Sequence, residues 1–181
     1  AAPVVIDAPA PLLPDWRPLD EEAEAALLGK IVDQVPLAVR EHRQAYYYLI
    51  KKAHHFTDTQ LDDRLDPDAD YADFARNPEL VRGSVVQVEG PVMRLSKTTM
   101  DAAKAGQPFI YEGQMMDRKG KIYSFVLTEP PAPPLIPGRV RMRDGIRATL
   151  TGFFMQILVY PSREIPPKDI ATPLIIGRRL H

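Results

Sequence analysis

The chain has 181 residues, of which 45% are apolar and 26% are charged, as in globular proteins that bury a substantial core. It contains no cysteine, which excludes disulfides, thiolate metal sites and a cysteine nucleophile. The net charge of −1 hides an asymmetry, because residues 1–80 carry a net −8 and residues 81–181 a net +7. Either the two halves neutralise each other, or the basic half binds an anionic partner.

The first 19 residues are rich in proline, which lacks a backbone donor and fixes φ, so we expect an extended lead-in. Alanine- and proline-rich segments of this kind often follow a removed signal or membrane anchor. The lead-in therefore favours an extracytoplasmic or membrane-associated location over a cytoplasmic one. The longest apolar run, residues 153–160, falls far short of the roughly 18 residues of a spanning helix, so we expect no transmembrane segment.

Residues 20–80 are expected to form helices that pack on the rest of the chain. Asp20 is a suitable N-cap for a helix that begins with acidic residues, which the helix dipole favours. The longest helix is predicted over residues 37–56, where apolar side chains recur at spacings of three and four and form one stripe. Three consecutive tyrosines, residues 46–48, lie on this helix and suit either docking on a sheet or contact with a partner.

Short helices are expected before the first strand. Thr57 and Gln60 fit a capping box for a helix that ends before the Asp66-Pro67-Asp68 turn. Asp70 is a suitable cap for the segment YADFAR, and Pro78 begins a last turn.

The pattern changes to a period of two from Gly83 onward, which is typical of strands with one buried face. Gly90 and Gly152 stand where the long first and fourth strands must bend if the sheet closes. The predicted strands are residues 82–95, 109–116, 121–129, 145–154 and 173–180. The residues expected to line the interior are Val86, Val88, Ile146, Ala148 and Leu150. We therefore predict an α+β fold with N-terminal helices followed by a five-stranded antiparallel β-barrel over residues 81–181.

Three segments of the strand region resemble the OB-fold, a small five-stranded barrel. They are Asn77-Pro78-Glu79-Leu80-Val81-Arg82-Gly83, then Val86-x-Val88-x-Gly90, and later Gly145-x-x-Ala148-x-Leu150-x-Gly152. The resemblance covers roughly the last hundred residues and implies a barrel whose second and third strands can hold a ligand. The closing ATPLIIGR, residues 171–178, is also similar to bacterial proteins of unknown activity that carry an OB-like domain.

One departure from the OB pattern concerns the link between the third and fourth strands. OB-folds usually place a helix there, but residues 129–144 are too rich in proline for one. The end of the barrel must then be closed by another part of the chain, and the N-terminal helices are one candidate. An SH3-like or other small barrel also remains open for this reason.

The sequence offers little metal-binding or catalytic chemistry. His54 and His55 are adjacent on a helix and point about 100° apart, so we expect solvated helix-end histidines and no metal site. Asp66, Asp68 and Asp70 begin like a calcium loop, but Tyr71 stands where such a loop needs glycine. We expect no catalytic residues, metal or cofactor. The enzyme alternative rests only on scattered carboxylates, which are Glu89, Glu112 and Glu129.

Aromatic side chains alternate on the second and third strands. Stacking rings on these strands are how OB barrels hold single-stranded nucleic acid or sugars, and basic side chains can supply charge. The candidate ligand-binding residues are Tyr111, Tyr123, Phe125, Arg94, Lys121 and Arg147, with Phe109, Arg118, Lys119, Arg139, Arg141 and Arg143 as further members of the same surface. The competing interpretation is that the rings fill the barrel or pack on the helices.

The function expected from these observations is that of a non-catalytic, OB-like interaction module with a helical cap, which engages another protein or a cell-envelope component. The alternative is a binder of single-stranded nucleic acid or oligosaccharide that uses the face of the second and third strands.

Overall fold

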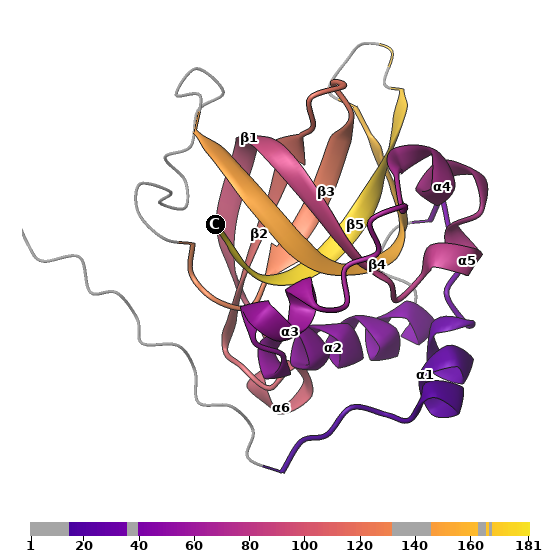
Figure 1. Ribbon diagram of the computed structural model, residues 1–181, viewed down its shortest axis with the longest axis vertical. Helices are drawn as coiled ribbons and strands as arrows, with labels where there is room; N and C mark the ends of the chain where they lie inside the picture. The colour runs from indigo at the N-terminus through magenta and orange to yellow at the C-terminus, as the bar shows by residue number, and fades with distance from the viewer. Residues whose placement is uncertain (1–14, 36–39, 132–145, 163–165, 167) are drawn as a thin grey trace, which may run out of the picture.

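The computed structural model describes residues 15–35, 40–131, 146–162, 166 and 168–181 (Figure 1). Within these residues the protein is a mixed α+β structure with six helices and a five-stranded sheet. The helices are α1 (Glu21–Leu28), α2 (Arg40–His55), α3 (Asp58–Asp62), α4 (Tyr71–Arg76), α5 (Pro78–Val81) and α6 (Ala102–Ala105). The strands are β1 (Val85–Thr99), β2 (Phe109–Met116), β3 (Ile122–Leu127), β4 (Arg147–Pro161) and β5 (Asp169–Leu180).

Side-chain caps confirm three of the predicted helix starts. Asp20 accepts a hydrogen bond from the N–H of Ala23 at the start of α1. Thr57 and Gln60 form a complete capping box on α3, and Asp70 caps α4 in the same manner. Because each cap satisfies N–H groups that the helix itself leaves free, these residues fix where the short helices begin.

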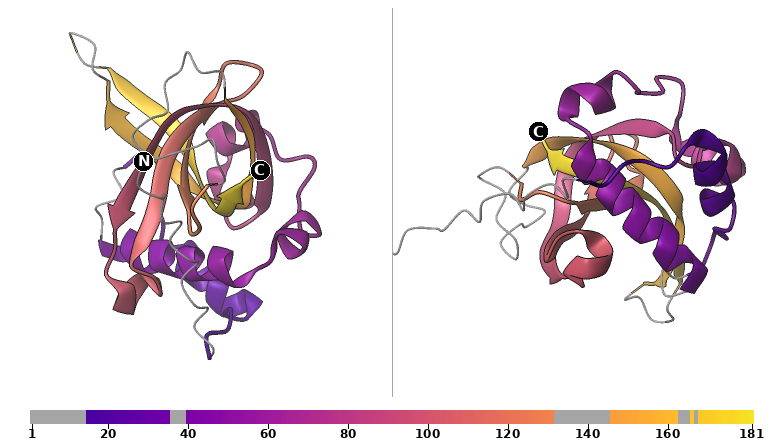
Figure 2. Two further views of the ribbon diagram at one scale, coloured as in Figure 1. Left: turned by 90° about the vertical axis from the view of Figure 1, so that its left-hand side faces the viewer. Right: turned by 90° about the horizontal axis from the view of Figure 1, so that it is seen from below.

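The five strands form a closed ring in the order β1-β2-β3-β5-β4, with β4 paired back to β1 (Figures 1 and 2). Strand β1 is long enough to pair with two neighbouring strands. Its residues 85–91 pair with β4, whereas residues 92–99 pair with β2. The ring therefore closes because one strand changes partner halfway along its length.

The prediction of an entirely antiparallel sheet was wrong for one pair. β3 and β5 run parallel, with Ser124 opposite Leu174 and Leu127 opposite Gly177, while the other four pairs are antiparallel. The reason is geometric. Directions cannot alternate all the way around a closed ring with an odd number of strands, so a five-stranded ring needs at least one parallel pair.

Gly90 marks the point where β1 changes partner. A Cβ at this position would lie 1.7 Å from the carbonyl oxygen of Met116, so only glycine allows the two strands to approach this closely. The ladder between β1 and β2 is irregular just beyond it, between Val92 and Arg94. In β4, a similar irregularity against β5 lies between Leu150 and Gly152. Both predicted glycines thus lie next to local breaks in the ladder.

The interior of the ring is apolar. Four of the five residues predicted to line it, Val86, Val88, Ala148 and Leu150, are buried there, and Ile146 packs against the same cluster. Phe74 of α4 enters this cluster and stacks on Phe154 with a centroid distance of 4.6 Å. An N-terminal helix thus fills part of the interior, as expected. The proline-rich link itself lies largely outside the described residues.

A second cluster joins the helices to the outer side of the sheet. The predicted apolar stripe is buried, and it consists of Ala45, Leu49 and Ala53 of α2 with Phe56 just after the helix. It packs with outward-facing side chains of the ring, which are Ile110, Val126, Phe153, Leu174 and Ile176. Figure 2 shows α2 lying across the ring from outside. This cluster covers only part of the outer face of the sheet.

Arginine–aspartate ion pairs among the described residues connect the acidic N-terminal part to the basic C-terminal part. Arg82 lies 2.6 Å from Asp33, and Arg179 pairs with Asp58. Asp33 also accepts the backbone N–H of Ile157 at 2.8 Å, which ties the loop after α1 to β4. These contacts match the neutralisation expected from the charge asymmetry. Among the described residues, none of the helices is long and apolar enough to cross a bilayer.

Candidate binding face on strands β2 and β3

The three predicted stacking rings lie inside the closed ring. Tyr111, Tyr123 and Phe125 are only 6%, 4% and 1% exposed, and all belong to the interior cluster. Burial and the nearby Asp117 carboxylate raise the pKa of Tyr123, so its hydroxyl stays protonated. The buried positions of the three rings match the interpretation that they pack in the core. A direct role for these rings in ligand binding stays a prediction that their burial does not support.

Phe109 is the exception among the aromatic residues of these strands. It is 37% exposed at the start of β2, and the Nζ atom of Lys97 lies 4.0 Å from the ring centroid. The side chain thus sits at the rim of the ring, beyond the interior cluster.

The three predicted basic ligand residues, Arg94, Lys121 and Arg147, are exposed. Arg147 shares the Glu89 carboxylate with Arg118, at 3.3 and 2.9 Å. The Nζ atom of Lys121 lies 5.3 Å from the centroid of the Tyr71 ring. The structure therefore separates these cations from the buried rings. Arg139, Arg141 and Arg143 lie outside the described residues.

The outward faces of β2 and β3 carry polar side chains that the sequence interpretation did not single out. Alternation along β2 places Glu112 and Gln114 on the other face of the sheet from Tyr111. In the same way, Ser124 lies on the other face from Tyr123 and Phe125. These three side chains bond to residues of the other three strands. We call the resulting set the polar row, and it consists of Thr98, Glu112, Gln114, Ser124, Tyr160 and Thr172.

Three cross-strand contacts each join two members of the polar row. The Thr98 hydroxyl donates to the Glu112 carboxylate at 2.7 Å, and the Gln114 amide donates to the Tyr160 hydroxyl at 2.5 Å. The hydroxyls of Ser124 and Thr172 lie 2.8 Å apart. Ser124 and Thr172 are buried, whereas the other four members are half-buried. The row is thus a preorganised polar surface that reaches from buried to accessible positions.

Glu112 is the single carboxylate of the polar row, and its charge acts on Tyr46 of α2. Burial, followed by the charge of Glu112, raises the pKa of Tyr46 well above its ordinary value, so the Tyr46 hydroxyl stays protonated at neutral pH. Tyr47 lies beside Tyr46 with a centroid distance of 6.0 Å and is half-buried. Tyr46 and Tyr47 also pack with the apolar cluster that α2 covers, so that cluster and the polar row share the neighbourhood of Tyr46.

Tyr160 comes from an arm formed by the ends of β4 and β5. Residues 157–161 pair with residues 169–173 beyond the part of β5 that pairs with β3, and Figure 2 shows this ribbon extending past the ring. Its contact with Gln114 connects the arm to the middle of the sheet face. Position 160 lies outside the predicted strand, so no pattern in the sequence assigned it to this face.

No protein-family model, curated protein or solved structure matches this chain. The described residues must therefore carry any functional interpretation.

The histidines are not the solvated helix-end residues that the sequence suggested. His42 is 1% exposed, and its Nε2 atom accepts the backbone N–H of Val32 at 3.0 Å. His54 is buried as well, and His55 packs edge-on against Trp16 at 5.2 Å. They were misread because the covering segments come from distant parts of the chain. The described residues contain no group of three or more side chains placed to hold a metal ion.

The three carboxylates behind the enzyme alternative each have a different partner. Glu89 bonds to Arg118 and Arg147, and Glu112 accepts from Thr98. Glu129 is buried and lies 2.6 Å from Nε of Arg178. Ion pairing and hydrogen bonding therefore account for each carboxylate separately.

Proposed function

We propose that the protein is a non-catalytic binding module with an OB-like ring, and that it engages a protein or a cell-envelope component through the polar row. In OB-folds the ligand lies on the face of the second and third strands, between the loops that follow the first and fourth strands. The polar row occupies the corresponding face, and the arm that carries Tyr160 is formed by the end of the fourth strand and the start of the fifth.

The observation that carries this proposal is the origin of the polar row. Its six hydrogen-bonding side chains come from all five strands, yet they gather on one face beside an apolar cluster. Their cross-strand hydrogen bonds hold them in place before any ligand arrives, which lowers the entropy lost on binding. Glu112 still has acceptor capacity beyond its bond from Thr98, because a carboxylate can accept several donors.

The chemistry of the row favours ligands that bond through hydroxyl or amide groups. A single carboxylate among amide and hydroxyl side chains suits a sugar or a peptide better than a phosphate backbone. An oligosaccharide, including a glycan of the cell envelope, is therefore the second candidate ligand. Nucleic acid is less well supported, because the three candidate stacking rings are buried.

Site-directed photo-crosslinking in cells tests the binding proposal. A photoreactive residue at position 94, which is exposed and pairs with Gln114 across β1 and β2, lies beside the polar row, and the same residue at position 104 lies on α6 as a matched exposed control. We expect adducts with an envelope protein or glycan from position 94 that are absent from position 104. Equal adducts at both positions would refute the polar row as the contact surface, and turnover of a substrate by the purified protein would refute a non-catalytic role.

A glycan array tests the second candidate. We expect the intact chain to retain specific oligosaccharides and Gln114→Ala to lose them, because the change removes the donor that reaches Tyr160. Retention of the same sugars by the variant would exclude the row as a sugar site.

A further inference from the structure

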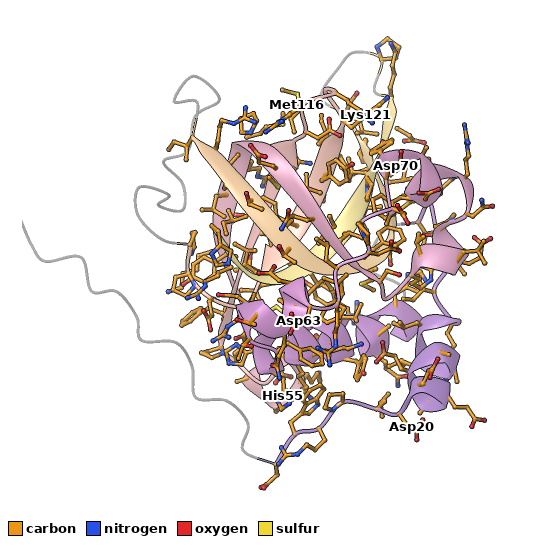
Figure 3. The ribbon with its side chains drawn as sticks, viewed as in Figure 1. Asp20, His55, Asp63, Asp70, Met116 and Lys121 are labelled. Carbon is orange, nitrogen blue, oxygen red and sulfur yellow. The ribbon has the colours of Figure 1, made fainter. Side chains whose placement is uncertain are left out.

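The turn between β2 and β3 presents basic side chains from a fixed backbone. Figure 3 shows Met116 and Lys121 at the end of the ring away from the helical side that carries His55. One Asp117 carboxylate oxygen accepts the N–H groups of Lys119 and Lys121, both at 2.8 Å. Gly120, with φ of 77°, closes the turn in a conformation that favours glycine. The turn is therefore held by its own aspartate.

The side chains at this end leave an excess of accessible positive charge. Arg118, Lys119 and Lys121 are all exposed, and Arg147 enters from the start of β4. The charged residues at this end of the ring are Arg118, Lys119, Lys121, Arg147, Glu89, Asp117 and Asp70. Glu89 is shared by two arginines, and Asp117 is directed into the turn. Four cations therefore stand against three carboxylates at this end, and Lys119 is exposed at the tip of the turn.

An apolar pair lies directly beside these cations. Met116 and Ile122 are the last paired residues of the β2–β3 hairpin, and alternation places both on its outer face. Both are half-buried. The hairpin end thus combines exposed cations with partly accessible apolar side chains, as interfacial membrane-binding surfaces do.

We propose that this hairpin end, residues 116–122 with Arg147, rests on the surface of a membrane that contains anionic lipids. Basic side chains at a projecting tip can reach phosphate groups that lie in a plane, and the neighbouring Met116 and Ile122 can contact the boundary between headgroups and acyl chains. Nucleic acid fits this surface less well, because bases need accessible rings for stacking and Tyr123 behind the tip is buried. This contact does not depend on the ligand of the polar row.

Vesicle co-sedimentation of the intact chain tests this proposal. Vesicles of phosphatidylcholine mixed with phosphatidylglycerol are compared with vesicles of phosphatidylcholine alone, at low and high salt. We expect binding to the anionic vesicles at low salt, and its loss at high salt, because screening weakens contacts between exposed charges. Failure of the protein to bind anionic vesicles, or equal binding to neutral ones, would overturn the proposal.

Charge reversals locate the surface. Arg118→Glu with Lys119→Glu is expected to lower the partition coefficient by at least about tenfold, since each basic residue near an anionic surface contributes roughly fivefold. Lys104→Glu makes the same kind of change on α6, where Lys104 is 64% exposed, and should change partitioning by less than about twofold. Equal losses in both would refute the hairpin as the contact.

Two further experiments test the apolar contact and the competing nucleic-acid ligand. Met116→Ser should weaken vesicle binding without changing its salt dependence, because it removes apolar contact and no charge. Labelled single-stranded DNA is the competing ligand. Salt-sensitive DNA binding that the hairpin charge reversal abolishes, with no vesicle binding, would assign this surface to nucleic acid and overturn the membrane contact.

Discussion

The two faces of strands β2 and β3 differ in chemistry although they share the same backbone. The inner face carries Tyr111, Tyr123 and Phe125, which pack in the interior of the ring. The outer face carries Glu112, Gln114 and Ser124, which bond to neighbouring strands. A shift of one residue in register would exchange the two sets, so closure of the ring is what decides which face meets solvent.

This difference also separates stability from recognition. Interior rings lose both apolar burial and packing contacts when they are truncated. Accessible polar pairs on the outer face exchange protein hydrogen bonds for water and contribute little net stability. Substitutions on the two faces should therefore differ in the free energy of unfolding, and the first two predictions concern the interior and the strand contact that closes it.

Phe154→Ala is expected to have the largest effect. Phe154 is fully buried and stacks on Phe74, so truncation should lower the free energy of unfolding by about 3–5 kcal/mol, as measured by urea denaturation. Phe109→Ala is the matched control at an exposed ring and should cost about 1 kcal/mol or less. Similar losses for the two variants would contradict the division into inner and outer faces.

Gly90→Ala tests the close approach that lets β1 change partner. The new Cβ would overlap the rigid carbonyl oxygen of Met116, so we expect a loss of about 3 kcal/mol in the free energy of unfolding. Gly120→Ala is the control, because no atom lies within 4 Å of its added Cβ and only the positive φ opposes the change. That control should cost about 1 kcal/mol. If Gly90→Ala were equally mild, the proposed contact between β1 and β2 would be wrong.

Local patterns predicted much of the fold. The capping residues located three helices, and the alternating pattern placed β2 at its observed bounds. The arm was missed because residues 157–160 are continuously apolar and show no alternation from which to predict half-buried strand. The parallel pair was missed because strand direction around a ring is a property of the whole sheet, which no single segment encodes.

The candidate site was harder to predict than the fold. The sequence shows aromatic and polar residues in alternation on β2 and β3, but it does not state which set faces inward. Aromatic side chains on these strands are typical of sites that bind flat ligands, yet the interior of a closed ring also needs them. His42 shows the same limit, since the N–H of Val32 that its side chain accepts comes from a loop ten residues away.

Two substitutions that each remove a hydrogen bond from the polar row are expected to have intermediate effects on the free energy of unfolding. Ser124→Ala leaves the buried Thr172 hydroxyl without this partner, so we expect a loss of roughly 1–3 kcal/mol in the free energy of unfolding. Tyr160→Phe removes the bond from Gln114, which is half-buried and can bond to water, so about 1 kcal/mol or less is expected. Chemical denaturation of both variants tests this order, and the reverse order would contradict the burial gradient along the row.

The smallest expected effect lies at the exposed end of the ring. The hydrogen bond from Arg118, followed by that from Arg147, holds the pKa of Glu89 below its ordinary value of 4.5. A folded-state pKa that is lower than the unfolded one stabilises the protein above the unfolded value, and this contribution disappears as pH falls through the folded value. Any stabilisation by Glu89 should therefore be lost only below pH 4.5, and it should be slight because the group is exposed.

Titration of the Glu89 carboxyl carbon by NMR measures this shift directly. Arg118→Ala should move the titration midpoint upward further than Arg147→Ala, because the Arg118 hydrogen bond is the first cause of the lowered pKa and the shorter of the two contacts. Lys104→Ala, which removes a cation that pairs with Asp101, should leave the midpoint unchanged. A midpoint at or above 4.5 in the intact chain would show that Glu89 does not hold the two arginines. Arg118 and Arg147 would then both lack this carboxylate partner, which would increase the positive charge at this end of the ring. The outer surface there would differ from the apolar interior in net charge as well as in polarity.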